Sequence, residues 1–189
     1  TYSAVAIRDD RVVALGWGEL GERYEAERII DLDGRLVVPG FIDTHIHISG
    51  DPDRWVDLSG LENLAELKAR VTRKAEQIGS GEWITGYGWS EDELVEQRRP
   101  LRWDLDDAAP ANPVVLTRAG GHSSVASTLA LEAAGLTPES PVPPGAIIEV
   151  DDQGRMNGVL REGAQGLVSR LVPDPTPNEL RGSFVQNLR

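Results

Sequence analysis

The 189 residues of the sequence are enough for one sizeable hydrophobic core, or for one domain and part of another. The net charge of -12 comes from acidic residues spread along the chain, without the clustered Lys and Arg of a duplex-binding surface, so nucleic acid is not an expected partner. No apolar run approaches the roughly 18 residues that a transmembrane helix needs, so no membrane association is expected.

The counts of reactive residue types limit the chemistry further. The chain has no cysteine, which excludes disulfides, thiolate metal sites and a cysteine nucleophile, and favours a reducing compartment; a cytoplasmic location is therefore expected. Its three histidines are His45, His47 and His122, and its two lysines are Lys68 and Lys74. So few candidate ligands restrict the catalytic site that this chain can build by itself.

Residues 1–39 are predicted to form β-structure. Four short apolar runs are joined in pairs by turns, and the second turn is Asp33-Gly34. Asp-Gly between apolar runs is typical of a tight hairpin. The runs are residues 4–7, 12–15, 29–32 and 36–38. Two hairpins are therefore expected, before Pro39-Gly40 interrupts the pattern.

Residues 41–48 are predicted to form a strand buried on both faces, because the segment is apolar except at Asp43, His45 and His47. Alternate residues of a strand point to the same face, so the two imidazoles project side by side, close enough to share one ion. A His-x-His pair can also arise by chance. Two unpartnered imidazoles in an apolar strand would be costly, however, and imidazole is the commonest zinc ligand, so a metal site is favoured.

Helices and strands are predicted to alternate in the rest of the chain. The clearest helix spans residues 61–79, where apolar residues recur at spacings of three and four, with Ser59 and Glu62 as a capping box. Both lysines lie on this helix and are expected to face solvent. Further helices are expected over 124–134, over 163–172 and from Thr176-Pro177 onward, and strands over 83–87, 114–117, 146–150 and 155–160.

Several segments, taken together, resemble a known family. Residues 34–47 are similar to the amidohydrolase superfamily signature at the first barrel strand, and residues 9–16 to the small β-sandwich that precedes it. Later segments narrow the resemblance to amidohydrolase family 3, the YtcJ-like metal-dependent hydrolases. These segments are residues 86–91, 105–110, 113–116, 121–131 and 158–162.

The resemblance implies an α/β fold, namely part of a distorted TIM (β/α)8 barrel preceded by strands of a small composite β-sandwich domain. Residues 1–39 would belong to the sandwich, and residues 40–189 would supply the first strand or strands and helices of an incomplete barrel, with an inserted segment. One or two divalent metal ions would be bound, with zinc as the expected metal, and His45 and His47 would supply some of the ligands. The family's lysine, second histidine pair and general-base aspartate would fall after residue 189, so the chain is expected to carry half a metal site at most.

Four other residues are candidates around such a site. The resemblance implies that His122 lies in the substrate pocket, and Glu162 could point towards the substrate while Trp89 could form part of the pocket wall, so all three are candidates for substrate binding. Each also has a structural alternative: His122 could order the loop after Gly120-Gly121, Trp89 could pack in the core, and Glu162 could cap a helix. Asp43 could hold a ligand histidine in place or be structural within the barrel, and it is not expected to bind the metal itself.

The function expected from these features is metal-dependent hydrolysis of C–N bonds of amide type, other than peptide bonds, by metal-activated water. The substrate would be a small molecule, and a homo-oligomer is possible. A TatD-like metal-dependent nuclease or phosphoesterase is an alternative, because Asp-Thr-His-x-His also resembles the start of those barrels, although they lack the N-terminal sandwich. A truncated, catalytically incomplete module is another, because the later ligands are missing.

Overall fold

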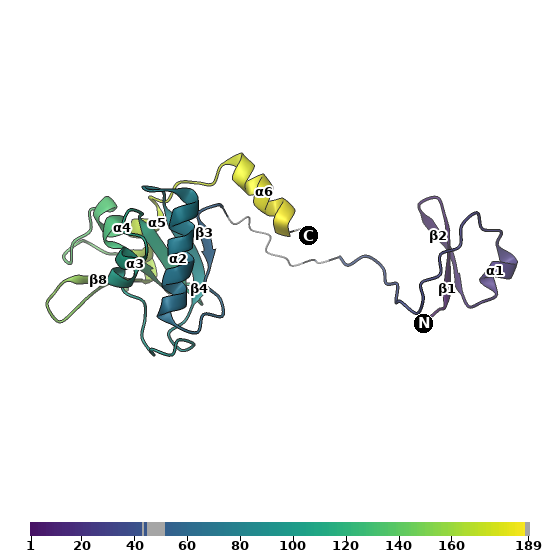
Figure 1. Cartoon of the computed structure of the whole chain (residues 1–189), viewed down its shortest axis with the longest axis horizontal. Helices are drawn as coiled ribbons and strands as arrows, with labels where there is room; N and C mark the ends of the chain where they lie inside the picture. The colour runs from purple at the N-terminus through teal and green to yellow at the C-terminus, as the bar shows by residue number, and fades with distance from the viewer. Residues whose placement is uncertain (43, 45–51, 188–189) are drawn as a thin grey trace. The chain divides into compact units, whose positions relative to one another are not determined.

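The computed structural model describes residues 1–42, 44 and 52–187. The chain divides into two compact units, Thr1–Ile46 and His47–Arg189. Figure 1 shows a strand hairpin in the first unit and a sheet covered by helices in the second. No helix in the described part of the chain is both long and apolar enough to cross a membrane.

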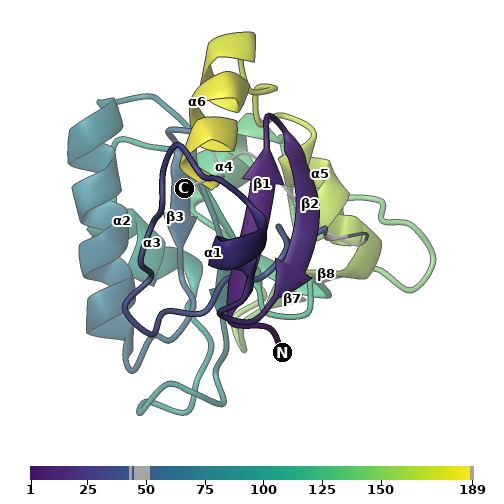
Figure 2. The same ribbon diagram turned by 90° about the vertical axis from the view of Figure 1, so that its right-hand side faces the viewer.

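The first unit contains the first of the two predicted hairpins. Strands β1 (Ala4–Arg8) and β2 (Arg11–Gly16) pair antiparallel and lie side by side in Figure 2. Asp9 has a φ of 56°, a left-handed conformation that the short polar side chain tolerates in a tight turn. The short helix α1 (Leu20–Arg23) follows and buries Leu20. The first hairpin prediction is therefore confirmed.

The second predicted hairpin forms its turn but not its strands. Asp33 and Gly34 have φ values of 49° and 73°, as a type I′ turn requires, and the Arg35 N–H donates to the Leu32 carbonyl at 2.9 Å. Within the described residues neither flanking segment joins a ladder. Of the predicted strand 41–48, residues 41, 42 and 44 lie outside any strand, and the others lie outside the described residues.

The second unit is built on a six-stranded mixed sheet in the order β3-β4-β5-β6-β8-β7. The first three strands pair in parallel, and the other three pairings are antiparallel. In chain order the strands are β3 (Trp55–Asp57), β4 (Ile84–Trp89), β5 (Val114–Arg118), β6 (Ser123–Ala126), β7 (Ile147–Val150) and β8 (Met156–Arg161). The α/β class is confirmed, whereas the described sheet is open and mixed, so the barrel stays a prediction.

Helices cover both faces of this sheet, and the alternation of β5 shows how. Val114 and Leu116 belong to the core cluster formed with α2 and α3, whereas Val115 belongs to the cluster formed with α4 and α5. Both faces of β5 are thus buried, as expected of a central strand flanked by helices. The helices are α2 (Leu64–Ile78), α3 (Arg102–Ala108), α4 (Thr128–Ala133), the 3-10 turn η1 (Glu162–Gln165), α5 (Gly166–Ser169) and α6 (Pro177–Asn187).

Two predicted helix starts were wrong. Helix α2 begins at Leu64, and the Asn63 side chain caps it by accepting a hydrogen bond from the Glu66 N–H at 2.8 Å. The predicted Ser59 cap is instead in a turn, where its N–H donates to Asp57 Oδ1 at 2.9 Å. The predicted helix 124–134 begins as strand β6 because the chain reverses after β5 and pairs with it; α4 starts only after Ser127, which accepts from the Ala130 N–H.

The predicted cap of the last helix is confirmed. The Thr176 N–H donates to Glu179 Oε2 at 2.7 Å, and the Glu179 N–H donates to Thr176 Oγ1 at 3.2 Å, which is a reciprocal capping box. Both lysines lie on α2 with exposed contacts, Lys68 to the Asp107 carboxylate and Lys74 to the Asp53 carbonyl. Neither lysine therefore lies on a strand, and the position on a helix that the sequence predicted for both is confirmed.

Gly158 sets how closely β8 approaches the start of α3. Its φ is 97°, and a Cβ at this position would lie 2.6 Å from the Ala126 carbonyl oxygen and 2.7 Å from Arg102 Cβ. Gly154, in the turn before β8, has a φ of 76°, but a Cβ there would have no atom within 4 Å. An added side chain would strain the backbone at both glycines, but it would clash with neighbouring atoms only at Gly158. Substitutions at the two positions therefore distinguish the cost of backbone strain from the cost of a steric clash.

We expect Gly158→Ala to lower the free energy of unfolding by about 3 kcal/mol or more, because strain and overpacking add. Gly154→Ala, the matched control, should cost about 1 kcal/mol from strain alone. Urea unfolding followed by tryptophan fluorescence measures both. Equal losses in the two variants would contradict the close approach at Gly158.

Candidate functional site

The strand directions bring several loops to one edge of the sheet. Strands β3, β4 and β5 are parallel, and β8 runs the same way as β5, because each pairs antiparallel with β6. Open α/β sheets bind ligands outside the carboxyl ends of their strands. We call this the carboxyl edge, and its residues are 57–59, 90–92, 118–122 and 161–162.

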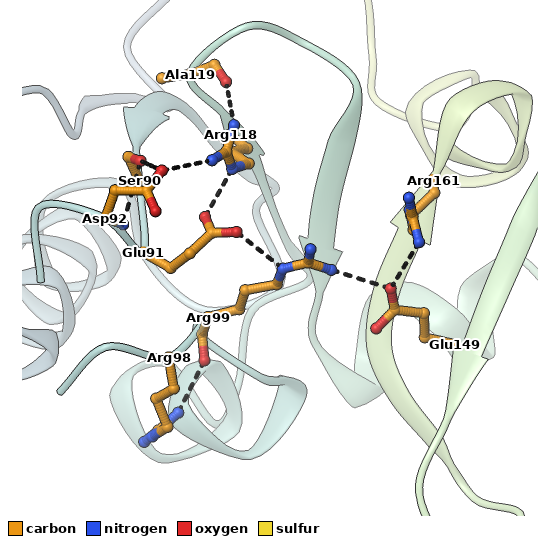
Figure 3. Close-up of polar contacts among 9 residues, drawn as sticks. All are labelled: Ser90, Glu91, Asp92, Arg98, Arg99, Arg118, Ala119, Glu149 and Arg161. Carbon is orange, nitrogen blue, oxygen red and sulfur yellow. Dashed lines mark hydrogen bonds and ion pairs between the residues drawn. The ribbon is translucent and has the colours of Figure 1, made fainter.

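Glu91 is the central charge of the carboxyl edge (Figure 3). Arg118 Nε donates to its Oε2 at 2.6 Å, and Arg99 Nε donates to its Oε1 at 3.1 Å. Burial of the carboxyl group acts to raise its pKa, but the hydrogen bonds from the two guanidinium groups outweigh burial and hold the pKa of Glu91 below its usual value. Glu91 therefore remains a carboxylate at neutral pH.

The ion pairs continue on both sides of Glu91. Arg118 Nη2 also donates to Asp92 at 3.1 Å, while Arg99 Nη1 donates to Glu149 on β7 at 3.0 Å. Arg161 on β8 lies 3.7 Å from the same Glu149 oxygen. Figure 3 shows acids and arginines alternating in this series of ion pairs, which we call the charge chain. Its members, in order, are Asp92, Arg118, Glu91, Arg99, Glu149 and Arg161. Three cations meet three anions, so the members of the charge chain have no net charge. Their contacts connect the loop after β4 and the end of β5 to strands β7 and β8.

We expect Glu91→Gln to lower the free energy of unfolding by about 1–3 kcal/mol near pH 7, because two half-buried guanidinium groups would lose a charged partner. The folded-state pKa of Glu91 is depressed, so its stabilisation is present above the unfolded-state pKa of about 4.3 and is lost as pH falls through the folded-state pKa. The difference between variant and wild type should therefore shrink in acid.

Urea unfolding at a series of pH values measures this difference. Glu132→Gln is the matched control, because Glu132 is exposed on α4 and should show almost no change. A Glu91→Gln penalty that stays constant into strong acid would contradict the charge chain.

The structure brings His122 and Glu162 together at the same edge. His122 Nδ1 lies 3.3 Å from Glu162 Oε2, and the Glu162 N–H donates to the His122 carbonyl at 3.0 Å. The side chains are 79% and 53% exposed, respectively. Two of the three residues expected to bind substrate thus form one accessible pair.

Two neighbours of this pair were not found by sequence reasoning. Gln165 Nε2 donates to the Gly121 carbonyl at 2.9 Å, and the Gly120 N–H donates to the Tyr87 hydroxyl at 3.1 Å. Tyr87 lies within a segment that carries the family resemblance, but its polar role had no separate signal. Gln165 had no signal in the sequence, since its partner is 44 residues away.

Trp89 has a different environment. Its side chain is fully buried in the core cluster of α2 and α3, and its indole N–H donates to the Leu116 carbonyl at 3.2 Å. A buried indole whose donor is satisfied offers no surface to a ligand. This geometry matches the packing alternative considered for Trp89, with the residue supporting the carboxyl edge from beneath.

His45, His47 and Asp43 lie outside the described residues, so their roles stay predictions. Among the residues that the structure describes, no three His, Cys, Asp or Glu side chains are grouped so that they could hold a metal ion. The described residues of the carboxyl edge offer hydrogen-bonding and charged groups.

Comparison with known proteins identifies the relatives of the chain. A model described as "Amidohydrolase family" matches residues 28–189. The chain is 32% identical over 176 residues to the putative amidohydrolase YtcJ of Bacillus subtilis, covering 90% of this chain and 33% of that protein. It is 38% identical over 145 residues to the N-substituted formamide deformylase of Arthrobacter pascens, covering 74% of this chain and 27% of that protein.

A solved structure is similar as well. It is the crystal structure of an uncharacterized metal-dependent hydrolase from Pyrococcus furiosus, with a TM-score of 0.56 and 28% sequence identity over 97% of this chain and 36% of that one. The chain thus spans about a third of the length of the proteins that it matches.

Proposed function

The chain belongs to the amidohydrolase family, and from this premise we propose that the whole protein hydrolyses C–N bonds of amide type, other than peptide bonds, with a metal-activated water. The observation that carries the proposal is the family match over residues 28–189, which includes the His45 and His47 pair. A relative named for deformylation of N-substituted formamides and a metal-dependent hydrolase structure support the same chemistry.

His45 and His47 would hold the metal ion, which we propose to be zinc. Their spacing and donor chemistry fit such an ion, with further ligands required from residues outside this pair. When bound, a divalent metal supplies a nucleophilic hydroxide at neutral pH and polarises a carbonyl. Asp43 would orient one of the two imidazoles by accepting a hydrogen bond from the ring nitrogen that does not bind the metal. One or two ions would be present in the whole protein.

The residues of the carboxyl edge would bind and orient the substrate. His122 and Glu162 are accessible there and would contact it, whereas Trp89 would support the site from the core. The charge chain centred on Glu91 would hold the surrounding loops in place. We further propose that residues 1–39 belong to a composite β-sandwich and residues 40–189 to a distorted TIM barrel with an inserted segment.

The partner of this site would be a small molecule, in a cytoplasmic protein that can form a homo-oligomer. The net charge of -12 opposes a nucleic-acid substrate, because phosphate contacts need clustered cations. The absence of cysteine fits a reducing compartment.

We expect His45→Ala and His47→Ala in the whole protein to reduce bound metal and to lower amide hydrolysis by about 1000-fold, because each removes a ligand to the ion. Elemental analysis by mass spectrometry and hydrolysis of formanilide and acetanilide measure the two effects. Gln153→Ala, in the exposed β7–β8 turn, is the control and should change neither. Unchanged metal content and activity in the histidine variants would refute the proposal.

The nuclease alternative is tested with the same proteins. Bis(p-nitrophenyl) phosphate and duplex DNA should be hydrolysed far more slowly than the amides. Rapid phosphodiester cleavage without amide hydrolysis would favour the TatD-like function. A wild-type protein that binds no metal and hydrolyses neither class would favour a non-catalytic module.

A further inference from the structure

The backbone around His122 is held by one turn of 3-10 helix. The Glu162 N–H donates to the His122 carbonyl at 3.0 Å, and Gln165 Nε2 donates to the preceding carbonyl, that of Gly121, at 2.9 Å. Both donors come from η1, which follows β8 directly. The position of the His122 backbone is therefore set by contacts distant in the sequence.

Glu162 adopts an unusual conformation to make these contacts. Its φ is 49°, in the left-handed region that a residue with a Cβ occupies only at a cost in free energy. In that conformation it presents both its N–H and its carboxylate to His122. Gln165 Nε2 also donates to the Glu162 carbonyl at 3.3 Å, which closes the turn. Backbone strain of this kind is concentrated at functional sites.

The contact with Glu162 favours the tautomer in which the proton is on Nδ1 of His122. An ionised carboxylate only accepts hydrogen bonds, so His122 Nδ1, 3.3 Å from Glu162 Oε2, must be the donor. In a neutral imidazole, Nε2 then keeps its lone pair and is an acceptor. No donor within the described ranges makes a hydrogen bond to Nε2, and the side chain is 79% exposed. The pair thus presents an accessible acceptor at the carboxyl edge.

We infer that His122 Nε2 accepts a hydrogen bond from the N–H of a secondary-amide substrate, and that Glu162 and Gln165 are positioning residues that maintain this tautomer. The inference rests on the proposed C–N hydrolysis and narrows its substrate class to amides that bear an N–H. A tertiary amide or an ester lacks this donor and therefore cannot make the hydrogen bond to Nε2, which lowers its affinity relative to a secondary amide.

The tautomer is measured by nitrogen NMR at about pH 8 on the whole, metal-loaded protein with labelled histidine. His122→Asn identifies the signals. The wild type should show a protonated Nδ1 and an unprotonated Nε2 for His122. Glu162→Ala and Gln165→Ala should both shift the population toward a protonated Nε2, and Gln153→Ala should not. A wild-type His122 protonated on Nε2 would overturn the inference.

Substrate recognition is measured with formanilide and N-methylformanilide, which differ in the N–H. Formanilide should shift the Nε2 signal of the wild type, and N-methylformanilide should leave it unchanged. His122→Asn should lower kcat/KM for formanilide about tenfold, the effect of one hydrogen bond, with less than about twofold change for the N-methyl compound. Equal effects on both compounds would overturn N–H recognition.

The two proposals fail in different ways. If the wild type hydrolyses no amide, the proposed function is refuted together with N–H recognition of a substrate, while the NMR tautomer still decides the roles of Glu162 and Gln165. If formanilide is hydrolysed but neither binding nor turnover distinguishes it from its N-methyl analogue, only the recognition by His122 is refuted.

Discussion

The shared direction of β3, β4, β5 and β8 is the constraint on which the rest of the second unit depends. Helices α2 and α3 connect the parallel strands, and β8 is aligned with them through its pairing to β6. The segments that follow these strands therefore meet at one edge, although they are far apart in the sequence. Glu91, Arg118 and His122 lie at this edge because each is at or just beyond the carboxyl end of a strand that runs in the shared direction.

Elements with local signals were predicted well from the sequence. The apolar spacing of α2, the short apolar runs of β4 and β5, and the Asp-rich turn between β7 and β8 all act within a few residues, as does the Thr176 cap. Such signals need no knowledge of distant partners. The start of α2 was missed because Asn63 lies close to other residues that are able to cap a helix.

The features that were missed depend on partners brought close by the fold. Ser123–Ala126 pairs as a strand because β5 lies beside it, although its sequence is compatible with a helix. The contacts of Glu91 with Arg118 and of Gln165 with Gly121 join residues 27 and 44 positions apart. The pattern of a single sequence does not indicate which residues so far apart along the chain come into contact. The pairing of His122 with Glu162 was likewise invisible, although both residues were candidates.

The charge chain from Asp92 through Glu91 to Arg161 also has a thermal consequence. Hydration of charged groups becomes less favourable on heating, so the cost of partly desolvating the four least exposed of these six side chains falls while their mutual attraction persists. Hydrophobic stabilisation per unit area levels off over the same range. The loops at the carboxyl edge should thus be held relatively more firmly in a warm protein than in a cold one, and high ionic strength should weaken their exposed contacts.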